Sequence, residues 1–382
     1  MIKNLILTLI SIIGIGTSTA LSQQITGSWE AIASYGGIPT RMIETSDKVY
    51  TLSQGNLSSY DKKSGEIYYY NKSNILNGDR IANIFYNYDR DYLLISYDDD
   101  NIDVLTDDRR VINFPEIMNA SLTSAKTINN VAFSGPRAYL ATGYGLTVLN
   151  VDKGIVEQSG IYDFPIAAVA VTSDRVFVCI TTGSTGTPGT WSAPLTSSLN
   201  RFESFTKALN DQVMNLEALS DNTILGIGNS MVKLTYNAET DKITMQVIRG
   251  GFNKTKLQRT RDGFFAHDSG SKFVMFLDKD GENRREVTLP AAVAGNAVSC
   301  YAGDESKLWV GNSEGYGLYD VTTGQFTINR MKPEGTSGPN VGLIKSAADG
   351  SIYFMTMSDS NINTASYINN VFVDKLSPDG TY

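Results

Sequence analysis

The sequence is poor in the residues from which metal and redox sites are built. Its 382 residues include one histidine, His267, and two cysteines, Cys179 and Cys300. A structural zinc site takes four cysteine or histidine ligands, so no zinc site of ordinary spacing can be assembled. The cysteines lie far apart in apolar, strand-like segments. They can form a disulfide in an oxidising compartment or be two buried small side chains, and we favour the second alternative. We expect no metal and no cofactor.

Positive charge is also in short supply. There are 32 lysines and arginines against 40 aspartates and glutamates, which gives a formal net charge of −8. Proteins that bind nucleic acids use lysine and arginine to neutralise phosphates, so the composition argues against a nucleic acid partner. The acidity by itself indicates little more than a well solvated surface.

Only one stretch is apolar enough to be considered as a signal peptide or a membrane anchor. It covers residues 5–16, follows an early lysine, and precedes the small residues Ala20 and Ser22. An uncleaved anchor is the alternative to a signal, but this run is roughly a dozen residues and a spanning helix needs about 20. The pattern predicts a secretory signal peptide over residues 1–22 and a mature start near Gln23. We therefore expect an exported protein with no membrane-spanning segment after cleavage.

Glycine and aromatic residues are abundant, with 34 glycines, 20 tyrosines and 15 phenylalanines. The stretch Lys307–Phe326 reads as strand, glycine-rich turn, strand, turn and strand. Weaker copies recur at a spacing of about 38 to 47 residues, which is typical of repeat folds. The copies begin near Ile43, Ile81, Ile128, Ile166, Val213, Lys256, Ala297 and Val341.

Units of four strands at this period predict an all-β fold, a single β-propeller over residues 23–382. We expect seven four-stranded blades, or alternatively eight if the last unit counts as a blade. The last unit lacks its final strand, and the strand-like segment Ser28–Tyr35 can complete it, so that the N-terminal strand closes the ring. In another alternative, the last unit begins a second propeller that the chain does not finish.

The fourth unit carries an insertion rich in glycine, threonine and proline between Ile180 and Leu195. We interpret it as a long loop between strands. An aromatic side chain on such a loop can stack on a sugar or contact a partner, so Trp191 is a candidate ligand-binding residue.

Basic residues cluster in and around the sixth unit, against the acidic background. Within the cluster, Lys254 with Lys256 and Arg259 with Arg261 alternate at the period of a strand. The alternatives are ordinary exposed strand faces and a patch that binds a glycan bearing phosphate or carboxylate. The candidate ligand-binding residues are Arg249, Lys254, Lys256, Arg259, Arg261, Arg284 and Arg285.

Two local patterns resemble catalytic or metal motifs. Residues 311–315 spell Gly-x-Ser-x-Gly, but a nucleophile elbow leads from a strand into a helix, and here a second strand follows. The acidic stretches 98–103 and 278–282 lack the glycine and glutamate positions of an EF-hand loop, so we interpret them as hairpin turns. The sequence therefore predicts a protein that is not an enzyme.

Two known families share these patterns. The unit LWVGNSEGYGLYDVTTGQF, residues 308–326, resembles the repeat of propeller sensors in hybrid two-component regulators of Bacteroidota. The stretch from WEAIASYGGIPTRMIETSDKVYTLSQGNLSSYDKKSGEIYYY to DYLLISYDDDNIDVL, residues 29–105, is similar to the start of the N-terminal propeller of the PorZ family of type IX secretion system components. The segment RAYLATGYGL, Arg137–Leu146, also has a counterpart in that family.

The resemblance to the PorZ family implies a non-enzymatic protein of the periplasm or cell surface, associated with the outer membrane. It would work with the sortase that attaches secreted proteins to anionic lipopolysaccharide, so the sortase, other surface proteins and that lipopolysaccharide are the implied partners. Proteins of the family continue into a second propeller and a C-terminal β-sandwich, for which this sequence has no room. The alternatives are a glycan-sensing propeller of a two-component regulator and a propeller lyase or glycosidase.

Overall fold

The structure is a computed structural model that describes residues 39–378 except for short internal segments. The segments left out are 182–185, 211–212, 214, 241, 252–254, 269–272, 292, 294–296, 301–305, 313–314, 332–334, 338–339 and 358–370. The expected signal peptide, the mature start and the segment Ser28–Tyr35 therefore lie outside the described residues.

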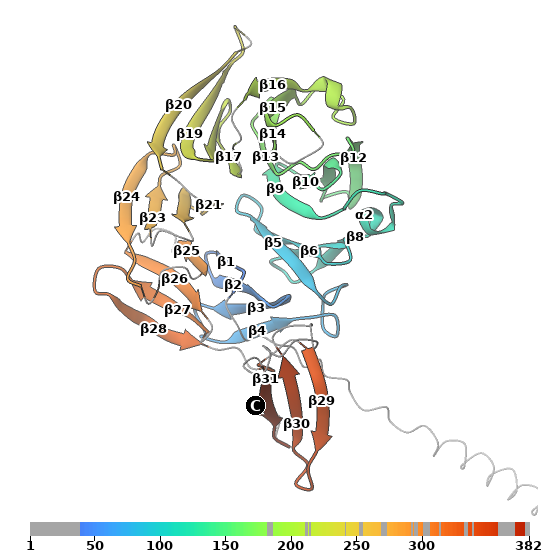
Figure 1. Ribbon diagram of the computed structural model, residues 1–382, viewed down its shortest axis with the longest axis vertical. Helices are drawn as coiled ribbons and strands as arrows, with labels where there is room; N and C mark the ends of the chain where they lie inside the picture. Colours follow the sequence, from blue (N-terminus) through green and yellow to red (C-terminus); the bar gives the residue numbers. More distant parts are fainter. Residues whose placement is uncertain are drawn as a thin grey trace, which may run out of the picture. The chain divides into compact units, whose positions relative to one another are not determined.

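The described chain folds into small antiparallel sheets, and seven of them have four strands that are consecutive in the sequence (Figure 1). We number these sheets as blades 1 to 7 in chain order. Blades 1 to 3 contain β1 (Arg41–Glu44), β2 (Lys48–Ser53), β3 (Asn56–Asp61), β4 (Ile67–Tyr70); β5 (Ile81–Asn87), β6 (Tyr92–Tyr97), β7 (Ile102–Thr106), β8 (Val111–Phe114); and β9 (Ile128–Ser134), β10 (Arg137–Thr142), β11 (Gly145–Asn150), β12 (Ile155–Ile161).

Blades 4 to 7 follow the same plan. They contain β13 (Ala168–Val171), β14 (Arg175–Ile180), β15 (Gly189–Pro194), β16 (Thr206–Leu209); β17 (Asn215–Ser220), β18 (Thr223–Ile227), β19 (Ser230–Asn237), β20 (Lys242–Gly250); β21 (Thr255–Arg259), β22 (Phe264–Asp268), β23 (Phe273–Leu277), β24 (Asn283–Thr288); and β25 (Ala297–Cys300), β26 (Lys307–Asn312), β27 (Gly315–Asp320), β28 (Gln325–Met331). An eighth, three-stranded sheet contains β29 (Asn340–Ser346), β30 (Ile352–Met357) and β31 (Val371–Leu376).

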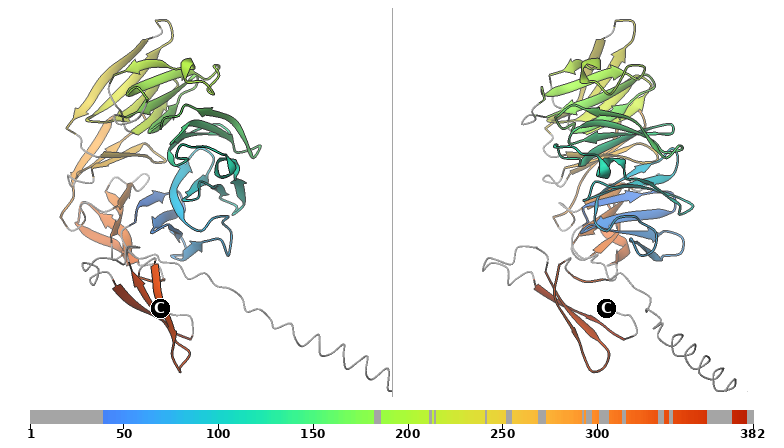
Figure 2. Two further views of the ribbon diagram at one scale, coloured as in Figure 1. Left: turned by 45° about the vertical axis from the view of Figure 1, so that its right-hand side comes forward. Right: turned by 90° about the vertical axis from the view of Figure 1, so that its right-hand side faces the viewer.

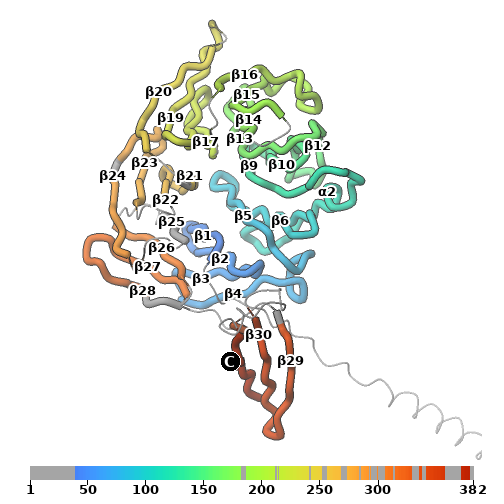
Figure 3. Tube along the Cα trace, viewed as in Figure 1, coloured from blue at the N-terminus to red at the C-terminus, as the bar shows by residue number. Residues whose placement is uncertain are grey.

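The first strands of the seven four-stranded sheets form a ring around a central channel. β1 contacts β5, and the series continues through β9, β13, β17 and β21 to blade 7, whose first strand β25 packs back against β1 (Figure 1, Figure 2). Figure 3 follows the same order in colour along the trace. The first strand of each blade is thus innermost, and the fourth strand lies at the rim.

Hairpin chemistry explains the regular pairing within each blade. In blade 1, β2 and β3 pair from Lys48↔Asp61 to Ser53↔Asn56, which leaves Gln54 and Gly55 as a two-residue turn. Both turn residues have positive φ, 49° and 79°, which is the conformation that matches the twist of the two strands. Glycine at the second position adopts it without steric cost.

The hydrophobic core is divided into seven clusters, one at each interface between neighbouring blades. At the interface that closes the ring, Trp309 of blade 7 is fully buried and lies 5.6 Å from the ring of Tyr60 in blade 1, measured between ring centroids. Packing of sheet on sheet through such side chains holds the ring together, because the pairing of strands stays within each blade.

The repeat predicted from the sequence is confirmed. The innermost strands begin at Arg41, Ile81, Ile128, Ala168, Asn215, Thr255 and Ala297, and the eighth sheet begins at Asn340, each within two residues of its predicted start. Seven blades form the ring. It closes where β1 packs on β25. Among the described strands, the three of the eighth sheet pair with one another and with no others. The prediction that Ser28–Tyr35 completes that sheet stays a prediction, because those residues lie outside the described part of the chain.

Helical structure is minor in the described residues, which contain α2 (Glu116–Asn119) and the single 3₁₀ turn η1 (Phe202–Ser204). None of the described helices has the length and apolar character needed to span a bilayer. Cys179, on β14, is a free and fully buried thiol, and burial raises its pKa to about 11. It therefore packs as a small apolar side chain.

The acidic stretches accept hydrogen bonds from their own turns and from neighbouring segments. Asp103, on β7, is fully buried and accepts hydrogen bonds from Asn77 N and Nδ2 at 2.8 and 2.9 Å, Asn113 Nδ2 at 2.8 Å and Tyr97 Oη at 2.5 Å. Asp278 accepts the backbone N–H groups of Asp280 and Glu282. Among the described residues, no group of three or more histidine, cysteine, aspartate or glutamate side chains is placed to hold a metal ion.

Candidate functional site

A cavity of about 360 Å³ occupies the central channel. Its walls come from the innermost strands of blades 1 to 6, together with the turn after β5 and His267 on β22. The lining combines asparagine, glutamine and aromatic side chains with apolar ones and a few charged ones. The charged side chains that line the cavity are Arg41, Asp89, Glu217, Lys256 and Arg259.

Arg41 is the cation from blade 1. Its Nη1 donates to Asn83 Oδ1 at 3.1 Å, and its guanidinium lies 4.7 Å from the centroid of the Phe85 ring, so blade 2 fixes its position. Burial lowers the pKa of Arg41, and the charges of Glu217 and Tyr88 oppose this effect. The side chain stays protonated, because the pKa of arginine lies far above neutral pH.

Glu217, on the innermost strand of blade 5, is the less exposed of the two acids that line the cavity. Burial raises the pKa of its carboxyl to about 7, although the positive charges of Arg259 and Arg41 act in the opposite direction. Burial disfavours the ionised carboxylate because protein atoms solvate the charge less well than water does. Near neutral pH the carboxyl therefore exists in both protonation states.

Lys256 and Arg259 bring two further cations from β21 in blade 6. Arg259 Nη1 lies 3.4 Å from the carbonyl oxygen of Ala218, and its Nη2 lies 3.9 Å from Asp89 Oδ1. Burial lowers the pKa of Lys256, and the nearby Arg41 lowers it further. Three cations thus face two acids, one of which is readily protonated, so the channel favours an anion despite the acidic composition of the whole chain.

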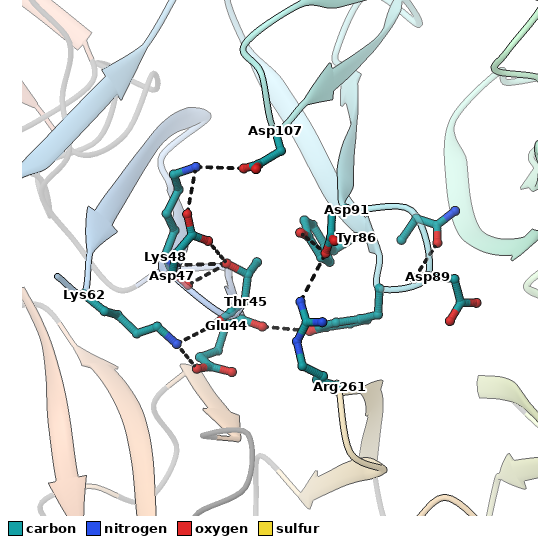
Figure 4. A network of polar contacts seen from close by, with 12 residues as sticks. Glu44, Thr45, Asp47, Lys48, Lys62, Tyr86, Asp89, Asp91, Asp107 and Arg261 are labelled. Atoms are coloured by element: carbon teal, nitrogen blue, oxygen red, sulfur yellow. Dashed lines mark hydrogen bonds and ion pairs between the residues drawn. The ribbon is translucent and has the colours of Figure 1, made fainter.

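A network of ion pairs lies at the face where the innermost strands end (Figure 4). Lys62 Nζ binds the buried carboxylate of Glu44 and the carbonyl oxygen of Thr45. Lys48 Nζ contacts Asp107 Oδ1 at 3.0 Å and so joins blade 1 to blade 2. Arg261, just after β21, points toward Asp91 in the turn after β5, with 3.1 Å between Nη2 and Oδ1.

The basic residues predicted from the sequence do not form one patch. Lys256 and Arg259 line the channel and Arg261 lies at its rim, whereas Arg249 lies on β20 and Arg284 and Arg285 on β24, which are outermost strands. Arg249 there forms an ion pair with Glu286, with Nε and Oε1 3.0 Å apart. Lys254 lies outside the described residues. In blade 6, the first strand β21 and the fourth strand β24 lie three strand spacings apart, about 14 Å. The basic residues on β24 are therefore separated from those on β21.

The expectation that Trp191 lies on a long loop is wrong. Trp191 belongs to β15, the third strand of blade 4, and pairs with Val178 of β14 and Lys207 of β16. Its ring packs on Phe202 with 4.9 Å between centroids, and its Nε1 donates to the carbonyl oxygen of Thr187 at 3.1 Å. The segment GTWSAP continues the strand pattern of the blade, so the second half of the insertion is a strand.

Sequence reasoning missed Arg41 and Glu217. Each lies on a first strand, RMIE and NLEALS, that otherwise reads as an ordinary apolar blade strand. The signal that identifies them is a charged residue within the innermost strand of a repeat, because that strand faces the channel. The equivalent strands of blades 2 and 3 carry Asn83, Asn129 and Asn130.

The Gly-x-Ser-x-Gly pattern joins two antiparallel strands. Gly311 and Asn312 end β26, Gly315 begins β27, and Asn312 pairs directly with Gly315. A strand therefore follows the serine in the chain, where a nucleophile elbow requires a helix.

Comparison with known proteins identifies what the chain is similar to. Residues 49–206 match the family model of the N-terminal β-propeller domain of PorZ, a type IX secretion system component. This match confirms the resemblance to that propeller found in the sequence. A search of the curated proteins found no match to the chain.

Among solved structures, the chain is similar to PorZ of Porphyromonas gingivalis, described as an essential bacterial surface component of the type IX secretion system. The two share 19% identity with a TM-score of 0.69, over 87% of this chain and 43% of PorZ. The chain is also similar to the computationally designed protein Ika8, with 13% identity and a TM-score of 0.48 over 85% of this chain and 96% of Ika8. Its similarity to the WD40 propeller of Doa1 is 12% identity and a TM-score of 0.49, over 74% of this chain and 92% of that propeller. The chain thus spans less than half of the PorZ chain, and the likeness to PorZ supports the propeller fold.

Proposed function

We propose that the chain is a non-enzymatic binding module of the type IX secretion system at the bacterial surface. In this proposal it is exported by the signal peptide at residues 1–22, and the propeller assists the sortase-linked attachment of secreted proteins to anionic lipopolysaccharide. The match of residues 49–206 to the PorZ propeller family is the observation that carries the proposal. The solved relative is itself described as a surface component of that system.

The channel supplies a chemical reason for an anionic ligand. Arg41, Lys256 and Arg259 converge on a cavity of about 360 Å³, and neutral amide side chains such as Asn83 and Gln258 line the same walls. Guanidinium groups bind phosphate and carboxylate oxygens with two parallel hydrogen bonds, and amides complement sugar hydroxyls. The ligand roles predicted for Trp191, Arg249, Arg284 and Arg285 remain predictions for blade surfaces outside this cavity.

Co-purification from cells that possess a type IX secretion system tests this function. The full chain serves as bait, and a variant with Arg41→Gln and Arg259→Gln serves as the matched control. We expect the wild-type chain to recover the sortase machinery, anionic lipopolysaccharide, or both, and the variant to lose the lipopolysaccharide. Recovery of neither by the wild-type chain would exclude the proposal.

One observation favours a second candidate function, a lyase or glycosidase acting on an anionic glycan. A carboxyl with a pKa of about 7 in a polar channel, as at Glu217, has the proton affinity of a general acid or base. Incubation of the chain with anionic polysaccharides, followed by reducing-end analysis of the products, distinguishes the two. A binding module leaves the polysaccharide intact, whereas chain cleavage that is lost in Glu217→Gln would establish the enzyme.

A further inference from the structure

The turn between β5 and β6 reaches across the mouth of the channel. Asp91 Oδ1 lies 3.1 Å from Arg261 Nη2, and Asp89 Oδ1 lies 3.9 Å from Arg259 Nη2. These partners belong to blades 2 and 6, which are separated in the ring by blades 7 and 1 on one side and by three blades on the other. Contacts between them must therefore pass over the channel axis, and Asp89 is itself part of the cavity wall.

The turn is held in this position by its own blade and by both neighbouring blades. Tyr86 Oη donates to Asp91 Oδ1 at 3.1 Å, and Tyr88 Oη donates to the carbonyl oxygen of Glu44 in blade 1 at 3.1 Å. On the other side, Arg90 Nη2 contacts Asp152 Oδ1 of blade 3 at 2.7 Å. The carboxylates of Asp89 and Asp91 are thus presented to the arginines of blade 6 by a fixed backbone.

These two ion pairs are weak enough to be exchanged. The side chains of Arg259 and Asp89 are 41% and 72% exposed, and those of Arg261 and Asp91 are 35% and 51% exposed. Pairs with this exposure contribute little to stability, because water screens the charges. An oxyanion that binds a guanidinium through two hydrogen bonds is the stronger partner.

We propose that the turn Tyr88–Asp91 is an internal competitor for the anion site, and that a sugar bearing a phosphate or carboxylate group enters by displacing Asp89 and Asp91 from Arg259 and Arg261. The two aspartates then regulate affinity, because each ligand oxyanion replaces a carboxylate of the chain. The inference rests on the proposed function only for the class of ligand.

Titration calorimetry at low ionic strength tests the competition with two probes, glucose 1-phosphate and glucuronate. The full chain is compared with Asp89→Asn/Asp91→Asn, with the milder Asp89→Asn alone, and with Asp47→Asn. Asp47 lies in the network on the same face and pairs with Lys48 at 3.3 Å, so its substitution removes the same charge without touching the arginines. Circular dichroism verifies that each variant is folded.

We expect the double variant to bind at least one probe about threefold or more tighter than the wild-type chain, Asp89→Asn to show part of the gain, and Asp47→Asn to show none. Adding Arg259→Gln and Arg261→Gln should abolish the gain. Equal affinity in all variants, an equal gain in Asp47→Asn, or no binding of either probe by any variant would overturn the inference. Its failure is distinguishable from failure of the proposed function, because recovery of the sortase machinery by the wild-type bait does not depend on the competition.

Discussion

Arg41 of blade 1 and Glu217 of blade 5 interact through their charges inside the channel. Burial raises the pKa of Glu217, and the positive charge of Arg41 acts in the opposite direction. No local sequence pattern links the two residues, since three blades separate them along the chain. Closure of the ring brings them to one cavity. Because the pKa of Glu217 is raised to about 7, the charge of the channel depends on pH near neutrality.

Anion binding in the channel is expected to weaken as pH rises through about 7. Below pH 7, Glu217 is mostly protonated and neutral, so it does not offset the positive charges of the channel. Above pH 7, its carboxylate is negatively charged and repels an anion. Affinity for glucose 1-phosphate should therefore fall between pH 6 and pH 8, measured in buffers of constant ionic strength. The second ionisation of the phosphate, near pH 6, strengthens binding to the cations in both proteins. In Glu217→Gln the affinity should therefore not fall over this range, and a full decrease in that variant would contradict the assignment.

The same carboxyl should make folding stability depend on pH. Its folded-state pKa lies above the unfolded value, so the unfolded chain ionises first and the native state loses stability as pH rises from about 4.5 through about 7. Glu217→Gln should remove this penalty and stabilise the protein at pH 8 by at most about 3 kcal/mol. Urea unfolding at pH 5 and pH 8 measures the difference. Equal effects of the substitution at both pH values would show that the carboxyl is not perturbed.

Arginines of the channel and of the rim should differ in their contribution to binding. Arg259→Gln removes a guanidinium from the cavity wall, and we expect it to weaken binding of an anionic sugar about tenfold, as the loss of a charged hydrogen-bonding partner does. Arg249→Gln is the matched control, because Arg249 pairs with Glu286 on outermost strands. Calorimetric titration of both variants measures the difference. Equal losses would indicate a patch on the blade rim in place of a channel site.

Closure of the ring should depend on Trp309. Its side chain is fully buried against Tyr60, so Trp309→Ala leaves a large cavity at the seam between blades 7 and 1 and should cost about 3 to 5 kcal/mol in the free energy of unfolding. Trp191→Ala, which removes a partly buried ring from blade 4, should cost less. Denaturant titration of both variants checks the order. A smaller loss for Trp309 would mean that the seam contributes little to stability.

The buried carboxylate of Asp103 should be important for blade 2. Asp103→Ala leaves the N–H groups of Asn77 and Asn113 without their buried acceptor, and we expect a loss of about 2 to 4 kcal/mol. Asp103→Asn keeps an acceptor oxygen and should lose less. Thermal unfolding monitored by circular dichroism compares the two variants. Equal stability of Asp103→Ala and the wild-type chain would exclude a structural role for this carboxylate.

The sequence predicts the blades well because each blade is built from neighbouring residues. Alternating apolar positions recur along the chain, and short turns such as Gln54-Gly55 mark several of the units, so the starts of the innermost strands are located within a few residues. The channel is harder to predict, because Arg41, Glu217 and Arg259 come from three units and meet only after the ring closes. Proximity in sequence was misleading for Arg249, because its strand β20 is the outermost strand of blade 5, whereas β21, which carries Arg259, is the innermost strand of blade 6.

The central claim is that the channel of this propeller binds the anionic groups of lipopolysaccharide. The most direct test is titration of the full chain with purified anionic lipopolysaccharide, with the same material after removal of its phosphate groups as the control. We predict saturable binding that is weakened by dephosphorylation and by Arg41→Gln/Arg259→Gln. Binding that is unaffected by both changes would contradict the claim.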